Sequence, residues 1–264
     1  MERTFIASDW NPERYLEFAE ERTRPARDLL TRVAVDRPAR VLDVGCGPGN
    51  STALLAARWP DAAVIGMDSS PAMIDRAKQE WPDREWLLRD AGGDLSDLGR
   101  YDVVFSNAAL QWIPNHERLV SGLFGLLEQG GVLAVQVPHN ADSPMHRTVR
   151  RVAESPAWRM FFAEGFRQIY DSPETYYRYL CRMPAETDLW ETVYYHLMNS
   201  VDDILAWSRG TLLRVYVENL PDARTVERFE REVMELVTPH YQTQPDGRVL
   251  FPFKRLFFTA RNKS

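Results

Sequence analysis

The strongest constraint on this chain is a glycine-rich turn between an apolar run and a helix-like stretch. Residues 41–44 read Val-Leu-Asp-Val, glycines follow at positions 45, 47 and 49, and residues 50–56 are typical of a helix. Glycine lacks a Cβ atom and tolerates positive φ, so such a turn lets the backbone approach a ligand closely. The pattern predicts the first strand–turn–helix unit of an α/β fold, with a ligand at the turn.

Strand-like and helix-like segments alternate beyond this turn. Such alternation predicts right-handed βαβ units, a mostly parallel sheet with helices on both faces, and a ligand site beyond the carboxyl ends of the strands. The expected strands are 40–44, 63–67, 85–88, 102–106 and 132–137, and the expected helices between them are 50–58, 71–80 and 116–127.

The spacing of the glycines indicates which ligand the turn holds. A dinucleotide-binding turn has the pattern G-x-G-x-x-G, whereas here the third glycine comes one residue early and Asn50 stands in its expected place. With the acidic Asp43 just before the turn, this favours the S-adenosylmethionine loop of class I methyltransferases over a nicotinamide loop. The general acid of many nicotinamide enzymes, in the pattern Tyr-x-x-x-Lys, does not occur in the sequence.

Acidic residues after the next two strands fit the same cofactor. Asp68 ends one strand and can accept from two ribose hydroxyls, and Ser70 before Pro71 can cap the following helix, which leaves Asp68 free. Asp90 follows the next strand and can accept from the adenine amino group, while Ala91 offers a backbone donor. The alternative for Asp90 is a turn-forming aspartate.

The loop after the fourth strand reads Asn107-Ala-Ala-Leu-Gln-Trp112, and its small residues let it pass beside the sulfonium. It lacks the Asn-Pro-Pro motif that amino-methylating DNA enzymes use, which argues against methylation of an exocyclic amine. The expected cofactor-binding residues are Gly45, Cys46, Gly47, Asn50, Asp68, Ser69, Met73, Asp90, Ala91, Asn107, Ala108 and Arg22.

Composition limits the class of protein. The 264 residues are 44% hydrophobic and carry a formal net charge of −6, which argues against a nucleic-acid binder. No apolar run is long enough for a membrane span, the first nine residues lack a signal-peptide core, and two cysteines are too few for a disulfide framework or a zinc site. We expect a cytoplasmic protein without a metal site, a membrane partner or an obligate protein partner.

In the later half of the chain, strand-like and helix-like segments no longer alternate regularly. We expect a single domain with an N-terminal helical flap over 1–35, a cofactor-binding core over 36–140, a largely helical lid over 141–250 and the last strand over 251–264. Within these parts, Asn11-Pro12 and Pro25 each predict a helix start, and one strand is expected near 190–196. Helices are expected at 173–180, 201–211 and 224–237.

Several longer segments resemble one family, the trans-aconitate 2-methyltransferases. The residues that carry the resemblance are Ser8-Asp-Trp-Asn-Pro12 with Tyr15, Asp43 to Thr52, Asp68 to Met73, Asn107 to Trp112, Gly131 to Gln136, Trp207 to Arg214 and Phe253 to Arg261. The resemblance covers nearly the whole chain and implies a Rossmann-like class I methyltransferase with a mostly parallel, seven-stranded sheet. The chain departs from the family pattern at Val215 and over about 142–164.

The resemblance implies methyl transfer from S-adenosylmethionine to one carboxylate of trans-aconitate, giving a monomethyl ester and S-adenosylhomocysteine. A carboxylate with a pKa of about 4 is already ionised at neutral pH, so no general base is needed and no catalytic residue is expected. The enzyme has to align the oxygen, the methyl carbon and the sulfur and to exclude water.

A tricarboxylate acceptor needs cations and hydrogen-bond donors, and arginine suits planar carboxylates better than lysine. The expected substrate-binding residues are Trp10, Tyr15, Gln111, Trp112, His196, Arg209, Arg214 and Arg255. The nearest alternative is methylation of another small or carrier-bound carboxylate, such as a malonyl thioester. A non-catalytic cofactor-binding module is a second alternative, and turnover of S-adenosylmethionine separates it from an enzyme.

Overall fold

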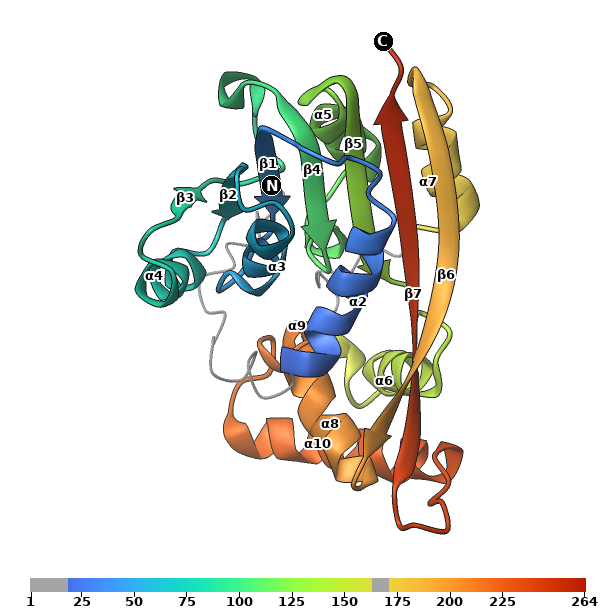
Figure 1. Cartoon of the computed structure of the whole chain (residues 1–264). Coiled ribbons are helices and arrows are strands. Elements are labelled where there is room, and N and C mark those ends of the chain that lie inside the picture. Colours follow the sequence, from blue (N-terminus) through green and yellow to red (C-terminus); the bar gives the residue numbers. More distant parts are fainter. Residues whose placement is uncertain (1–18, 163–170) are drawn as a thin grey trace. The chain divides into compact units, whose positions relative to one another are not determined.

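The computed structural model describes residues 19–162 and 171–264, apart from the side chains of residues 19, 20 and 22 (Figure 1). The chain divides into two compact units. The sheet unit comprises Met1–Pro138, Asp171–Thr192 and Arg255–Ser264, and the inserted unit comprises His139–Tyr170 and Val193–Lys254.

The sheet has seven strands in the order β3-β2-β1-β4-β5-β7-β6. Within the group β1 to β5, each strand runs parallel to its neighbours in the sheet. Strand β7 runs antiparallel to β5, as the arrows in Figure 1 show. The predicted mostly parallel, seven-stranded sheet is therefore confirmed. The strands are β1 Arg40–Val44, β2 Ala63–Asp68, β3 Glu85–Leu88, β4 Tyr101–Asn107, β5 Leu127–Pro138, β6 Ala185–Met198 and β7 Val249–Asn262.

The central strands are apolar because helices cover both faces of the sheet. Val41, Leu42 and Val44 of β1 are all fully buried, β4 is buried over nearly its whole length, and β5 is buried from residue 131 to residue 137. Such continuous apolar runs are typical of parallel strands. The helices of the sheet unit are α2 Ala19–Thr31, α3 Asn50–Arg58, α4 Pro71–Glu80, α5 His116–Phe124 and α7 Pro173–Leu180, with short 3-10 turns η1 Ser96–Leu98 and η2 Leu110–Trp112.

The position of Pro25 in α2 corrects one expectation. Pro25 does not begin a new helix but lies inside α2, which continues to Thr31. Proline removes one backbone donor from a helix interior, and here burial of Ala26, Leu29 and Leu30 offsets that loss. The helix expected to start at Asn11-Pro12 lies outside the described residues.

Several further boundaries differ from the prediction, among them the start of β5, which is Leu127 and not 132. Helix α5 ends at Phe124 rather than at Leu127, because Leu127 already begins β5. The strand expected near 190–196 is the 14-residue strand β6, and the last strand begins at Val249, ahead of the expected start at 251.

The inserted unit has an aromatic core of its own. The indole of Trp158 is fully buried, its ring lies 5.0 Å from that of Phe229, and its Nε1–H donates to Glu232 at 2.7 Å. This core holds the amphipathic helix α10 in place. The described helices of this unit are α6 Pro144–Ala153, α8 Val201–Arg209, α9 Arg214–Val217 and α10 Ala223–Val237, with 3-10 turns η3 Arg159–Phe161 and η4 Thr238–His240.

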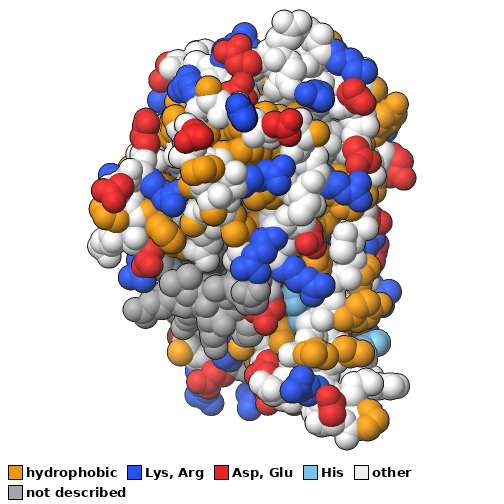
Figure 2. Space-filling model, viewed as in Figure 1, with side chains coloured by type: hydrophobic (Ala, Val, Ile, Leu, Met, Phe, Trp, Pro, Cys, Tyr) orange, Lys and Arg blue, Asp and Glu red, His pale blue; other side chains and the backbone are white. Residues whose placement is uncertain are grey.

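The surface carries mixed charge. In Figure 2 the Lys and Arg side chains are interspersed with Asp and Glu over the face in view. None of the helices described for residues 19–162 and 171–264 is long and apolar enough to cross a membrane. The same described residues contain no group of three or more His, Cys, Asp or Glu arranged to hold a metal ion.

Candidate cofactor and acceptor site

The glycine turn adopts a backbone that other residues rarely take. Gly45, Gly47 and Gly49 all have positive φ, at 71°, 54° and 97°. The backbone N–H groups of Gly45 and Cys46 both donate to Met67 O, at 2.7 and 3.0 Å, which ties the turn to the end of β2. A Cβ atom on Gly45 would lie 2.1 Å from Ala109 Cβ, whereas one on Gly47 would meet nothing within 4 Å. Gly45 therefore allows two loops to touch, and Gly47 leaves open space beside the turn.

Asp43 of β1 stabilises the glycine turn through hydrogen bonds to the start of α3. Its side chain is fully buried, and its Oδ2 atom accepts from Ser51 Oγ at 2.7 Å and from Thr52 Oγ1 at 2.6 Å. Its Oδ1 atom is buried without a hydrogen-bond partner among the described residues. Burial raises the pKa of Asp43 from 3.8 to about 6, and the two hydroxyl donors only partly oppose that rise. The carboxylate thus ties β1 to the first turn of α3.

This raised pKa predicts a stability loss as pH rises. Between its unfolded pKa of 3.8 and its folded value of about 6, the folded protein binds more protons at Asp43 than the unfolded chain. The unfolding free energy should therefore fall through this window by roughly 3 kcal/mol and stay level above it. Asp43→Asn should remove this fall. Urea unfolding of the wild type and of Asp43→Asn from about pH 4 to about pH 7 measures this fall. The contributions of the other titrating groups cancel when the two profiles are subtracted. An unchanged profile in the variant would contradict the prediction.

Asp68 connects the end of β2 to the glycine turn. Its Oδ2 atom accepts from Gly47 N at 2.9 Å and its Oδ1 atom from Ser70 N at 2.9 Å. Ser70 caps α4 as predicted, since its Oγ accepts from Met73 N at 3.3 Å. The expectation that this cap leaves Asp68 free is wrong, because both carboxylate oxygens hold backbone N–H groups. Each carboxylate oxygen has a second lone pair, with which it can also accept from a ribose hydroxyl.

The remaining cofactor candidates lie around this turn or after β3. Asn50 begins α3, directly after Gly49. Asp90 is exposed, and its Oδ1 atom accepts from Gly92 N at 2.8 Å, which is the turn-forming role that was its alternative. The other side chains range from exposed Ser69 to buried Cys46, Met73 and Ala91.

The loop after β4 is strained and firmly held. Ala108 has a φ of 56°, a region that costs a non-glycine residue about 1–2 kcal/mol. Two contacts hold it there: Ala108 N donates to Gln136 O at 2.9 Å, and Gln111 Nε2 donates to Ala108 O at 2.7 Å. The Oδ1 atom of Asn107 and the Oε1 atom of Gln111 are buried without partners among the described residues. Such strain and unsatisfied acceptors are typical of a site that binds a ligand.

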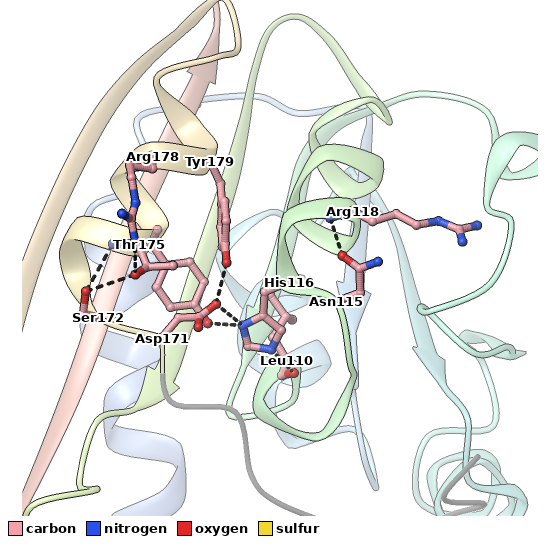
Figure 3. Close-up of polar contacts among 10 residues, drawn as sticks. Leu110, Asn115, His116, Arg118, Asp171, Ser172, Thr175, Arg178 and Tyr179 are labelled. Atoms are coloured by element: carbon pink, nitrogen blue, oxygen red, sulfur yellow. Dashed lines mark hydrogen bonds and ion pairs between the residues drawn. The ribbon is translucent and has the colours of Figure 1, made fainter. Parts of the chain in front are cut away.

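A buried polar network anchors the other end of this loop (Figure 3). His116 begins α5, and its Nε2 atom lies 2.9 Å from Leu110 O. A carbonyl oxygen only accepts, so Nε2 carries the proton and Nδ1 accepts from the hydroxyl of Tyr176, at 2.7 Å. Burial lowers the pKa of His116, which keeps the imidazole neutral. Asp171 Oδ2 lies 3.4 Å from Nδ1 and accepts from Tyr179 at 3.0 Å.

This network predicts a stability effect. Tyr176→Phe leaves the buried Nδ1 atom of His116 without its donor, which should lower the unfolding free energy by about 1–3 kcal/mol. Tyr177→Phe on the same helix is the matched control, because Tyr177 is 53% exposed, and it should change stability by under about 0.5 kcal/mol. Urea denaturation of the two variants measures both values. Equal stabilities would show that the network does not hold the loop.

Three of the predicted substrate residues belong to the inserted unit. Arg209 makes two hydrogen bonds to Glu230, at 2.8 and 2.6 Å, and this pairing raises its pKa. Arg214 donates through Nε to Glu218 at 2.6 Å. His196 is buried, with its ring 4.8 Å from that of Trp207. Both guanidinium groups are therefore already paired with a carboxylate inside this unit.

Arg255 and Gln111 belong to the sheet unit instead. Arg255 is 3% exposed, and its Nη1 atom donates to Gln136 Oε1 at 3.0 Å. Gln136 and His116 were not among the predicted site residues, because the side chains they bond are 119 and 60 residues away in the sequence. Gln136 does end the segment Gly131 to Gln136 that carries part of the family resemblance, but the segment alone does not show what its side chain contacts. Trp112 is half-buried at the end of η2. Trp10 and Tyr15 lie outside the described residues, as does the side chain of Arg22.

Solved structures with the same fold cover nearly the whole chain. The YcgJ protein from Bacillus subtilis superposes with a TM-score of 0.59 at 13% identity, covering 91% of this chain and 99% of that one. The cyclase SpnF superposes with a TM-score of 0.55 at 16% identity, covering 90% of this chain and 80% of that one. These likenesses establish the fold, and one fold supports different reactions.

Sequence relatives are far closer. A family model for a methyltransferase domain matches residues 18–182. A trans-aconitate 2-methyltransferase from Methylobacterium radiotolerans is 43% identical over 262 residues, covering 97% of this chain and all of the relative. Another from an Enterobacter species is 40% identical over 256 residues, covering 97% of this chain and 99% of the relative. The chain therefore belongs to the trans-aconitate 2-methyltransferase family and is an S-adenosylmethionine-dependent methyltransferase of the class I fold.

Proposed function

We propose that this protein methylates one carboxylate of trans-aconitate, giving the monomethyl ester and S-adenosylhomocysteine. The observation that carries this proposal is full-length identity above 40% to proteins of that name, joined to the glycine turn held by Asp68. The acceptor is a small polycarboxylate, and no protein partner is required. Both cysteines are free thiols, which suits a reducing cytoplasm.

The residues of the sheet unit fit the cofactor. The open space beside Gly47, the carboxylate of Asp68 and the buried Oδ1 atom of Asn107 lie along the carboxyl ends of β1, β2 and β4. We propose that the glycine turn binds the methionine part, Asp68 the ribose and the segment Asp90–Ala91 the adenine. When bound, S-adenosylmethionine supplies an electrophilic methyl group on a positively charged sulfur.

The chain has to orient the acceptor and exclude water. A carboxylate nucleophile is ionised at neutral pH, so no side chain needs to remove a proton. The rate enhancement would come from alignment of the attacking oxygen with the methyl group. We propose that Gln111, Trp112 and Arg255 of the sheet unit contact the acceptor. Arg22 stays a prediction as a cofactor contact. The acceptor contacts that stay predictions are Trp10, Tyr15, His196, Arg209 and Arg214.

The test is an assay of purified protein with methyl-labelled S-adenosylmethionine and a panel of small polycarboxylates, read by mass spectrometry. The panel contains trans-aconitate, cis-aconitate, citrate and a malonyl thioester on its carrier protein. We expect transfer of one labelled methyl group to trans-aconitate. Labelling of the carrier-bound malonyl group alone would replace this function by the alternative one. Absence of S-adenosylhomocysteine with every acceptor would contradict both.

A further inference from the structure

The side chain of Gln136 is a buried hydrogen-bond donor that is not among the proposed acceptor contacts. Gln136 lies on β5 and is 0% exposed. Its Oε1 atom accepts from Arg255 Nη1 at 3.0 Å, while its Nε2 atom is buried without a hydrogen-bond partner among the described residues. A buried amide donor without an acceptor costs about 1–3 kcal/mol. A cost of this size points to a ligand that supplies the acceptor.

The sheet register places this donor beside the acceptor loop. Gln136 is the strand partner of Asn107 on β4, and its backbone oxygen holds the strained Ala108. On the other side of β5, Gln136 pairs with Phe257 and Pro138 pairs with Arg255. Directly paired residues and residues two apart share a face of a sheet, so Asn107, Gln136 and Arg255 project from the same face.

The contact with Arg255 gives this face its charge and orients the amide. A guanidinium group stays protonated at any physiological pH and only donates hydrogen bonds. Because Arg255 takes the Oε1 atom of Gln136, the amide turns its N–H groups the other way. The result is an amide donor and a cation, side by side and excluded from water, which together suit a planar anion with two oxygens.

We propose that Gln136 and Arg255 form a subsite for a carboxylate of the acceptor that is not methylated. This inference rests on the proposed function and adds Gln136 as a residue that determines specificity. A polycarboxylate can bind here with one carboxylate while another reaches the methyl group. A monocarboxylate has to give up one of the two interactions. The pair therefore selects polycarboxylates over monocarboxylates.

The experiment measures acceptor binding apart from turnover. Isothermal titration with tricarballylate, an unreactive saturated tricarboxylate, is carried out on the protein saturated with S-adenosylhomocysteine. Gln136→Met removes the donor at nearly constant volume and should weaken binding at least about tenfold. Gln136→Glu removes the donor and places a carboxylate opposite the carboxylate of tricarballylate, so repulsion between the two negative charges should weaken binding about a hundredfold or more. The affinity for S-adenosylhomocysteine should stay within about threefold in both variants, because the amide does not contact the glycine turn.

The control is Gln79→Met on the exposed side of α4, which makes the same chemical change away from the site. It should leave both affinities unchanged. Tricarballylate binding to Gln136→Met and Gln136→Glu within twofold of the wild-type value would overturn the proposal. If neither variant folds, the wild-type protein decides alone: crotonate, a monocarboxylate, should compete at least tenfold more weakly than tricarballylate, and equal competition overturns the subsite.

The assay with the acceptor panel separates this inference from the proposed function. If the wild-type protein methylates a different polycarboxylate, the proposed substrate fails, yet the Gln136 variants should still raise the KM for that acid and leave kcat nearly unchanged. If trans-aconitate is methylated and the Gln136 variants keep its KM, the function holds and the subsite fails.

Discussion

Gly45→Ala should abolish methyl transfer by removing the cofactor site. A Cβ atom at this position would lie 2.1 Å from Ala109 Cβ, so the glycine turn and the loop after β4 must move apart. The φ of 71° adds the strain that any L-residue with a side chain meets in this region. Together these effects should lower the unfolding free energy by about 2–4 kcal/mol and weaken binding of S-adenosylhomocysteine at least about a hundredfold.

Two further variants separate the clash from the backbone strain. Gly130→Ala is the control, because Gly130 has a φ of 77° in the same unit but a Cβ atom there meets nothing within 4 Å. It should cost only about 1 kcal/mol and keep cofactor affinity. Ala109→Gly combined with Gly45→Ala removes the clash and should restore part of the affinity. Calorimetric titration and urea unfolding measure these values, and normal affinity in Gly45→Ala would refute the assigned role of the turn.

Asp68→Ala should reduce cofactor affinity at least about a hundredfold, close to 3 kcal/mol. The carboxylate holds Gly47 N and Ser70 N, each at 2.9 Å, so its loss releases the turn in addition to the proposed ribose contacts. Hydrogen bonds to a charged group are each worth about 1.5–3 kcal/mol. The KM for the acceptor, measured at saturating cofactor, should change much less.

Asp75→Ala is the matched control for Asp68→Ala. Asp75 is an exposed carboxylate on the neighbouring helix α4, and its loss should leave cofactor affinity within about twofold. Asp68→Asn is the informative intermediate, because the amide keeps one acceptor oxygen and loses the charge. Its affinity should fall between those of the wild type and Asp68→Ala. If all three variants bind S-adenosylhomocysteine as the wild type does, Asp68 has no part in cofactor binding.

The elements around the glycine turn were predictable because local patterns decide them. The strand at 40–44, the helix at 50–58 and the Ser70 cap of the next helix all occur as predicted. Pro25 shows the limit of such patterns. Within a helix, proline is favoured in the first turn, but Pro25 lies inside α2, where buried apolar neighbours stabilise the helix. Tertiary burial outweighed the local preference there.

Asp68 shows a similar limit within the site. The sequence correctly placed it at the end of a strand, beside a helix cap. Its hydrogen bond to Gly47 joins the end of β2 to the glycine turn, 21 residues away in the sequence, and no spacing rule predicts it. The position of an acid can therefore be predicted more reliably than the hydrogen bonds it makes.

The sequence by itself determined the class of this protein: the alternation of strands and helices, the glycine turn and the acids that follow β2 and β3. These features are local, because hydrophobic period, caps and turn residues act over a few positions. Only the tertiary structure decided which buried polar groups meet. Arg255 reaches Gln136 across 119 residues and Tyr176 reaches His116 across 60, because strand order and helix packing bring them together. The proposed selection of the acceptor depends on the contact between Arg255 and Gln136. That contact orients the buried amide of Gln136, and a buried polar group is stabilised only by the partners that the fold brings to it.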